Sequence, residues 1–196
     1  WVEGRGRKRL LMEDWYRSVR RRHDILMDDG EPVDGRWNFD SDNRLPPPRG
    51  ETHLPVPPPW QPAEDEIDAE VRADLDAWAK EGVEFLGTDG PRRFAVTREE
   101  AIQALEDFID NRLALFGPYE DAVLWRDPFM AHSLLSVPLN LGLLHPVEVV
   151  DRAVEAWVDG RATIASVEGL IRQIIGWREY VWHLYWHLGA EYEELN

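Results

Sequence analysis

The chain has 196 residues, of which 43% are hydrophobic, so it can bury a core and is not disordered throughout. It contains no cysteine, which excludes disulfides and thiolate metal sites within it. Its formal net charge of −16 argues against a general nucleic-acid binder, because phosphate backbones attract cations. No apolar run could span a bilayer and no signal peptide opens the chain, so we predict a soluble, cytoplasmic protein.

The first predicted helix covers residues 11–22. Its apolar residues recur every four positions and form one stripe: Leu11, Trp15 and Val19. Its arginines lie mostly away from that stripe: Arg17, Arg20 and Arg21. We expect these arginines on a solvated face, and a face toward DNA or a partner is the alternative.

Residues 28–62 interrupt the helical pattern. Asp, Asn and Gly dominate residues 28–45, which predicts turns, with Trp37 and Phe39 pinning the loop to a core. Prolines crowd residues 46–62, which favours an extended chain and excludes helix and central strand. We therefore predict a domain boundary here, with residues 46–63 as the linker between residues 1–45 and residues 64–196.

Two helices are predicted directly after the linker. Residues 64–81 are acidic and carry one apolar stripe: Ile67, Val71, Leu75 and Trp78. Thr97 and Glu100 have the spacing of a capping box and open the next helix, which we expect Gly117 and Pro118 to end.

Two more helices complete the pattern. Pro146 is placed to open one of them, and Gly160 follows its end. The last helix is predicted over residues 166–188 and is apolar around much of its circumference, so we expect it to be buried on several sides. No alternation typical of a strand is found.

A small-polar turn precedes an apolar segment and is a candidate anion site. Two hydroxyls and two backbone N–H groups would bind the anion: Ser133, Leu134, Leu135 and Ser136. Tyr119 would add a phenol and Arg126 a charge. On spacing alone, a plain serine N-cap is the commoner explanation of this pattern.

A second candidate site lies in the last helix. Gln173 and Trp177 are four residues apart and share a helical face. A glutamine beside a tryptophan suits the reading of a nucleic-acid base, through the amide and through stacking. The alternative is Trp177 in the core, with Arg178 and Glu179 as a surface ion pair. His183 and His187 lack an HExxH pattern, so we expect them to be structural and predict no metal site.

Three stretches together carry a resemblance to a known family. They read WYRSVRRRHDILMDDGEPVDGRWNFDSDNR, FGPYEDAVLWRDPFMAHSLLSVPLNLGLL and SVEGLIRQIIGWREY. Over nearly its whole length the chain resembles the deoxyribodipyrimidine photolyase-related proteins, the bacterial and archaeal iron–sulfur six-four photolyases of the cryptochrome/photolyase family.

The resemblance implies a mainly α fold and a domain division. Residues 1–45 would end an N-terminal α/β antenna domain, residues 46–63 would connect it, and residues 64–196 would form the first half of the all-helical FAD-binding domain. The chain would thus be a fragment, inactive alone, with uncovered apolar helix faces through which it self-associates. Its localisation would be cytoplasmic, without a membrane.

The resemblance also implies a function and its residues. The function would be light-driven repair of UV-damaged DNA, with FAD giving an electron to a pyrimidine lesion, the six-four photoproduct; a cryptochrome-like flavin photoreceptor without repair is the alternative. The flavin diphosphate would be held by six residues: Tyr119, Arg126, Ser133, Leu134, Leu135 and Ser136. Arg172 would face the flavin, and Gln173 and Trp177 would act on the lesion as the catalytic pair.

Two departures from the family pattern bear on these implications. Gly176 makes the spacing from Gln173 to Trp177 one residue longer than in the commonest photolyase pattern. The cysteines that would bind the family's iron–sulfur cluster are absent from this chain, so the cluster, like the lumazine antenna, is implied only for the full-length protein.

Overall fold

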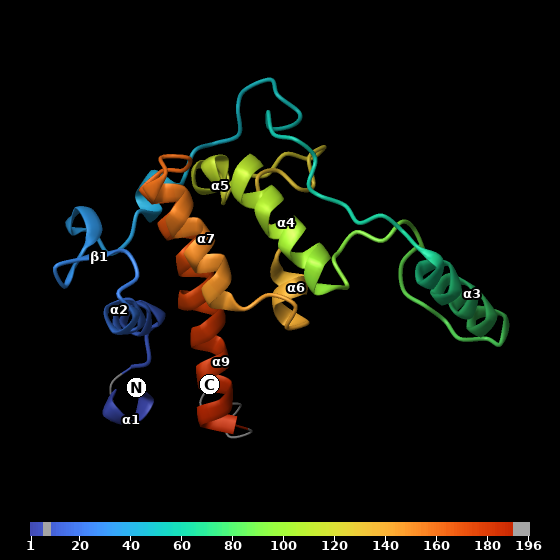
Figure 1. Ribbon diagram of the computed structural model, residues 1–196, viewed down its shortest axis with the longest axis horizontal. Coiled ribbons are helices and arrows are strands. Elements are labelled where there is room, and N and C mark those ends of the chain that lie inside the picture. The colour runs from blue at the N-terminus through green and yellow to red at the C-terminus, as the bar shows by residue number, and fades with distance from the viewer. Residues whose placement is uncertain (6–8, 190–196) are drawn as a thin grey trace.

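The computed structural model describes residues 1–5 and 9–189, which form a mainly helical protein with one small sheet (Figure 1). The α-helices of this part are α1 (Val2–Arg5), α2 (Met12–His23), α3 (Glu66–Lys80), α4 (Arg98–Asn111), α5 (Leu113–Tyr119), α6 (Ser136–Asn140), α7 (Pro146–Val158), α8 (Ile164–Ile171) and α9 (Glu179–Leu188). Two 3-10 turns are η1 (Val33–Gly35) and η2 (Asp40–Asp42), and the segment η3 (Arg172–Arg178) is π-helical. The predicted mainly α fold class is confirmed.

The sheet is a two-stranded hairpin that the sequence did not reveal. Strands β1 (Met27–Asp28) and β2 (Glu31–Pro32) pair antiparallel. Each strand has only two residues, too few for an alternating pattern to be recognised. Within the described ranges, no helix is both long and apolar enough to cross a bilayer.

One continuous rod, α8–η3–α9, forms the centre of the molecule (Figure 1). Thr163 caps its start by accepting a hydrogen bond from Ser166 N–H at 3.2 Å. Residues 166–171 are all buried, because α5, α7 and η2 pack around them. The predicted last helix is therefore confirmed, although it begins at Ile164 and its middle is π-helical. Its burial ends with η3, since in α9 only Leu184 is buried among the described residues.

The N-terminal segment packs against this rod. Tyr16 of α2 donates its hydroxyl proton to Glu168 Oε1 at 2.9 Å, and Phe39 N–H donates to Glu168 Oε2 at 2.9 Å. The aromatic anchors predicted in the loop are found, with Phe39 buried and Trp37 half-buried. Residues 12–43 thus share a core with the rod, and the division into domains stays a prediction.

The prediction of a solvated arginine face on α2 is wrong for Arg20. Only 1% of Arg20 is exposed, and its guanidinium donates to the carbonyls of Ile25, Leu26 and Trp37 at 3.0, 2.6 and 2.8 Å. The chain reverses at Asp24, which has a left-handed backbone, and this reversal brings the carbonyls to the end of α2.

The helix break between α4 and α5 also differs from the prediction. Thr97 caps α4 as expected, but α4 ends at Asn111, while Gly117 and Pro118 lie inside α5. A Cβ on Gly117 would lie 2.6 Å from Ser166 Cα. The glycine is therefore explained by the close approach of α5 to α8 and not by a helix stop.

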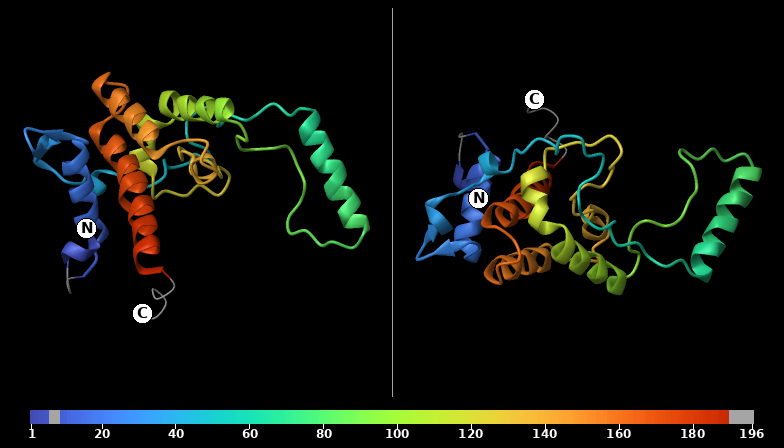
Figure 2. Two further views of the ribbon diagram at one scale, coloured as in Figure 1. Left: turned by 60° about the horizontal axis from the view of Figure 1, so that its bottom comes forward. Right: turned by 90° about the horizontal axis from the view of Figure 1, so that it is seen from above.

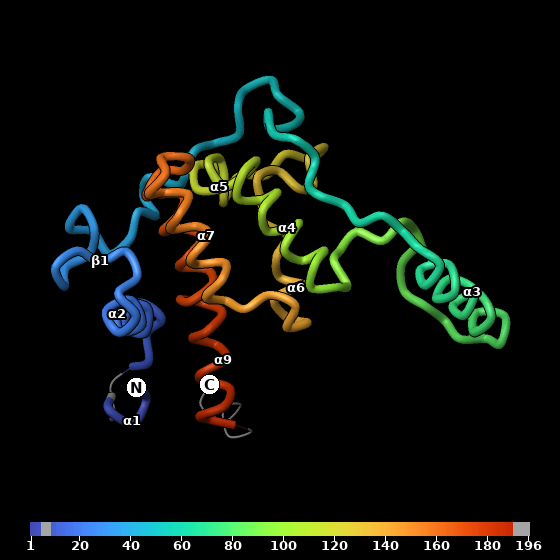
Figure 3. The backbone as a smooth tube through the Cα atoms, in the orientation of Figure 1, coloured from blue at the N-terminus to red at the C-terminus, as the bar shows by residue number. Residues whose placement is uncertain are grey.

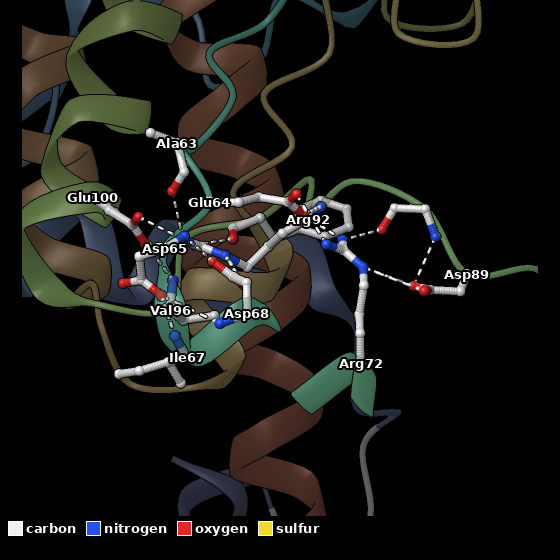
Figure 4. A network of polar contacts seen from close by, with 12 residues as sticks. Ala63, Glu64, Asp65, Ile67, Asp68, Arg72, Asp89, Arg92, Val96 and Glu100 are labelled. Carbon is white, nitrogen blue, oxygen red and sulfur yellow. Dashed lines mark hydrogen bonds and ion pairs between the residues drawn. The ribbon is translucent and has the colours of Figure 1, made fainter. Parts of the chain in front are cut away.

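Helix α3 projects away from the rest of the molecule (Figures 1 and 2). The tube in Figure 3 shows residues 46–63 running past α4 and α5 to reach it. The predicted helix is confirmed, yet none of its residues is buried, so its apolar stripe is uncovered. Figure 4 shows how polar contacts fix its base: Arg92 pairs with Asp68 and Glu100, each at 2.7 Å, and Arg72 pairs with Glu64.

Candidate functional site

The predicted anion-binding turn has a different local structure from a capped helix. Leu134 has a φ of +57°, an uncommon conformation for a residue with a side chain, and it turns the chain before α6. The Ser133 hydroxyl accepts a hydrogen bond from Leu135 N–H at 3.4 Å and so closes this turn. Leu135 precedes α6 without a side-chain cap, and Ser136 is exposed. The plain N-cap alternative is therefore wrong.

A small pocket of 20 Å³ lies against this turn. One of its lining residues, Arg112, was not predicted from the sequence. Ser133 and Leu134 line it together with Arg112, of which 2% is exposed. Burial lowers the pKa of Arg112, and burial together with the nearby Arg112 charge lowers the pKa of His132. Arg112 lies four residues after Phe108 in the predicted stripe, a spacing that indicates an inward side chain.

The other predicted diphosphate contacts lie outside this pocket. Tyr119 is half-buried at the end of α5, against a second small apolar cluster that includes Ala122 and Met130. Arg126 is exposed in the turn that follows. Neither Tyr119 nor Arg126 is among the residues that line the pocket, so their roles stay predictions.

Arg172 lies in a buried ion network at the junction with the N-terminal segment. Its nitrogens are 3.2 Å from Asp40, 3.6 Å from Glu120 and 3.4 Å from Glu168. Desolvation by burial raises the pKa of Glu120 to about 7, against the attraction of Arg172. The side chain of Arg172 is thus buried while that of its neighbour Gln173 is exposed, and the assignment of Arg172 to a flavin stays a prediction.

Gln173 and Trp177 line one groove. The groove has a volume of 940 Å³, and both side chains are exposed, Trp177 by 47%. The alternative that places Trp177 in the core is therefore wrong. The other wall residues come from the end of α6, from Arg178 and from α9: Asn140, Arg178, Val181, Trp182, Tyr185 and Trp186. Aromatic faces beside the amides of Gln173 and Asn140 suit a planar polar ligand.

The π-helical turn η3 sets the direction of these two side chains. A π-turn accommodates one residue more than an α-helical turn and often marks a functional site. Helix α2 supports it, because the Trp15 indole N–H donates to the Ile175 carbonyl at 2.9 Å. Gly176 allows this approach, since a Cβ there would lie 3.1 Å from Met12 Sδ.

The histidine pair in α9 belongs to this support. The His183 ring stacks on Trp15 with centroids 4.5 Å apart, and on His187 at 6.2 Å. Across residues 1–5 and 9–189, no group of three or more His, Asp or Glu side chains is placed to hold a metal ion.

Comparison with known proteins agrees with the motifs. A family model described as deoxyribodipyrimidine photo-lyase-related protein matches residues 1–85. The chain is 44% identical over 191 residues to a (6-4) photolyase of Agrobacterium fabrum, which covers 97% of this chain and 36% of that protein. An uncharacterized protein of Acanthamoeba polyphaga mimivirus is 41% identical over 68 residues, covering 34% of this chain and 52% of that protein. The chain thus spans between about a third and a half of the length of these relatives.

Proposed function

The chain belongs to the family of deoxyribodipyrimidine photo-lyase-related proteins, and we propose that it is part of an enzyme that repairs UV-induced pyrimidine lesions in DNA with light. The observation that carries this proposal is 44% identity to a (6-4) photolyase across 97% of the chain. That relative's name makes the six-four photoproduct the proposed lesion. The activity belongs to a full-length protein, of which this chain supplies the part described above.

FAD is the proposed cofactor, and the residues at the α6 turn fit its diphosphate. When bound and excited in its reduced form, FAD supplies an electron to the lesion. The turn at Ser133 and Leu134 borders a buried guanidinium, which favours an anionic group. Leu135 and Ser136 continue the proposed contact segment. Tyr119, at the end of α5, and Arg126, in the turn that follows, are proposed as further contacts.

The groove of Gln173 and Trp177 is the proposed lesion site. Photolyases reach a damaged base by flipping it out of the duplex, and a groove of 940 Å³ has room for such a nucleotide. Trp177 would stack on the flipped base, which is worth about 1–3 kcal/mol. Gln173 would hydrogen-bond the edge of the pyrimidine, so its loss would leave polar atoms of the lesion unpaired.

The family's other cofactors are proposed for the full-length protein only. Because this chain has no cysteine, thiolate ligands for an iron–sulfur cluster would come from other parts of that protein. A lumazine antenna is proposed on the same family grounds, and the exposed aromatic wall in α9 makes self-association of this chain a prediction.

The test uses the full-length protein that carries this chain. Illumination with reduced flavin should remove six-four photoproducts from an oligonucleotide. Gln173→Ala should weaken binding to damaged DNA about tenfold or more, with flavin content and binding to undamaged DNA unchanged. Gln103→Ala, on the exposed face of α4, is the matched control. Flavin photochemistry without any loss of lesion would contradict repair and indicate a photoreceptor.

A further inference from the structure

Arg112 is a buried cation without enough partners. Among the described residues, its Nε and Nη1 atoms have no hydrogen-bond acceptor. Its Nη2 atom lies 3.5 Å from Asp107 Oδ2. That same carboxylate accepts a hydrogen bond from Trp60 N–H at 3.0 Å and another from the Asn111 amide at 3.0 Å. Asp107 is therefore shared, and most of the donor capacity of the Arg112 guanidinium is unused.

Such a group destabilises a fold unless something else neutralises it. Burying a charge without hydrogen bonds is unfavourable, and buried charges in proteins are usually paired or bound to a metal ion. The Phe108 ring, with its centroid 6.0 Å from the guanidinium carbon, offers only a weak cation–π contact. Arg112 cannot lose its proton to escape the cost, because a guanidinium stays charged in proteins.

The pocket beside Arg112 has the size of a single oxygen. A volume of 20 Å³ exceeds the about 10–15 Å³ that one water-sized group needs, and it is too small for a ring. Ser133 and Leu134 form part of its wall, and Arg93 and Trp60 form another. A water molecule would fit the space but would bring no negative charge to the two guanidinium nitrogens that have no acceptor.

We propose that this pocket receives one phosphoryl oxygen of the flavin diphosphate, with Arg112 as its buried counter-cation. The inference rests on the proposed function, since it names a further binding residue for the same cofactor. Arg112 and the Ser133 segment line the same pocket, so both would contact this oxygen. The chemistry recognised is that of a phosphoryl oxygen, which free phosphate also offers.

The test replaces Arg112 by an apolar side chain of similar volume in the full-length protein. Arg112→Met should raise the thermal midpoint of the flavin-free protein by several degrees, because it removes a buried cation two of whose nitrogens have no acceptor, while Asp107 keeps its hydrogen bonds from Trp60 and Asn111. It should weaken FAD binding about 10- to 100-fold, as expected for lost hydrogen bonds to a charged group. Arg152→Met, which removes an exposed arginine paired with Glu106 and Glu155, is the matched control and should change neither.

Four probes separate the sources of the phosphoryl oxygen: FAD, ADP, adenosine and inorganic phosphate. FAD and ADP should protect the wild type against unfolding and lose this effect in Arg112→Met, while adenosine should protect neither. If phosphate and ADP protect the wild type but not Arg112→Met, and FAD protects neither protein, the anion pocket is supported and the proposed flavin function is contradicted. If FAD binds both proteins equally, or if Arg112→Met destabilises the flavin-free form, Arg112 is structural and the proposal is overturned.

Discussion

Replacing Glu120 by glutamine is expected to stabilise the protein at alkaline pH and not at acidic pH. The Glu120 carboxyl is largely buried beside Arg172, and burial raises its pKa from 4.5 to about 7. A raised carboxyl pKa means that the folded state holds a proton that the unfolded state has released. Stability from this group is therefore fully present below pH 4.5 and is lost as pH rises through 7.

The size of the effect follows from the shift. Each pKa unit corresponds to about 1.4 kcal/mol, so the cost of ionising Glu120 in the fold is about 3 kcal/mol above pH 7. Glutamine resembles the protonated acid in shape and has no charge to desolvate. For a chain of this size the gain corresponds to roughly 6–12 °C in thermal midpoint at pH 8.5.

The assay is urea unfolding of wild type and Glu120→Gln between pH 5 and pH 8.5. The difference in free energy of unfolding should be small at pH 5 and should grow in favour of the variant toward pH 8.5. Glu168 has a raised pKa and Asp40 a lowered one, so only the difference between the two proteins isolates Glu120. Glu70→Gln on the exposed helix α3 is the control for loss of one charge. A difference that is constant across this range, or that grows toward acid, would refute the reasoning.

Three further substitutions test the packing. Gly117→Ala should destabilise the fold by about 3 kcal/mol in urea unfolding, because its Cβ would lie 2.6 Å from a backbone atom of α8, and a loss under 0.5 kcal/mol would contradict that contact. Arg92→Ala should speed amide exchange in residues 66–80 with little change in the core, and unchanged exchange there would mean that the contacts in Figure 4 do not hold α3. Trp15→Phe should lower the free energy of unfolding by about 1 kcal/mol, because the hydrogen bond from the indole to the Ile175 carbonyl is lost, and it should speed amide exchange around η3. Faster exchange confined to α2 would contradict the supporting role of this helix.

Local signals explain why most helices could be predicted. Thr97 and Pro146 act within one turn of the helices that they begin, and the apolar stripes of α4 and α7 repeat over three turns. The extent of α3 was predictable for the same reason. The exposure of its apolar stripe could not be predicted, because it depends on which elements pack against α3. The periodicity of the sequence does not contain that information.

The errors concern residues whose role is set by distant parts of the chain. Arginine is usually a surface residue, and only the chain reversal after α2 supplies the carbonyl groups that Arg20 contacts. In the candidate site, the shared face of Gln173 and Trp177 followed from their spacing. The π-turn beneath them, and the buried position of Arg112 beside Ser133, depend on contacts with α2 and with the α6 turn.

The hydrogen bonds between α2 and the central rod also determine when the N-terminal segment becomes stable during synthesis. Tyr16 and Glu168 are 152 residues apart in the chain, and Trp15 and Ile175 are 160 apart. At about 5–20 residues per second, the ribosome needs on the order of ten seconds to bring the partners of α2 into existence. A 12-residue helix is marginal alone in water, so α2 is made well before the central rod and is stabilised only after the rod exists. Throughout that interval Tyr16 and Trp15 lack these two hydrogen-bond partners.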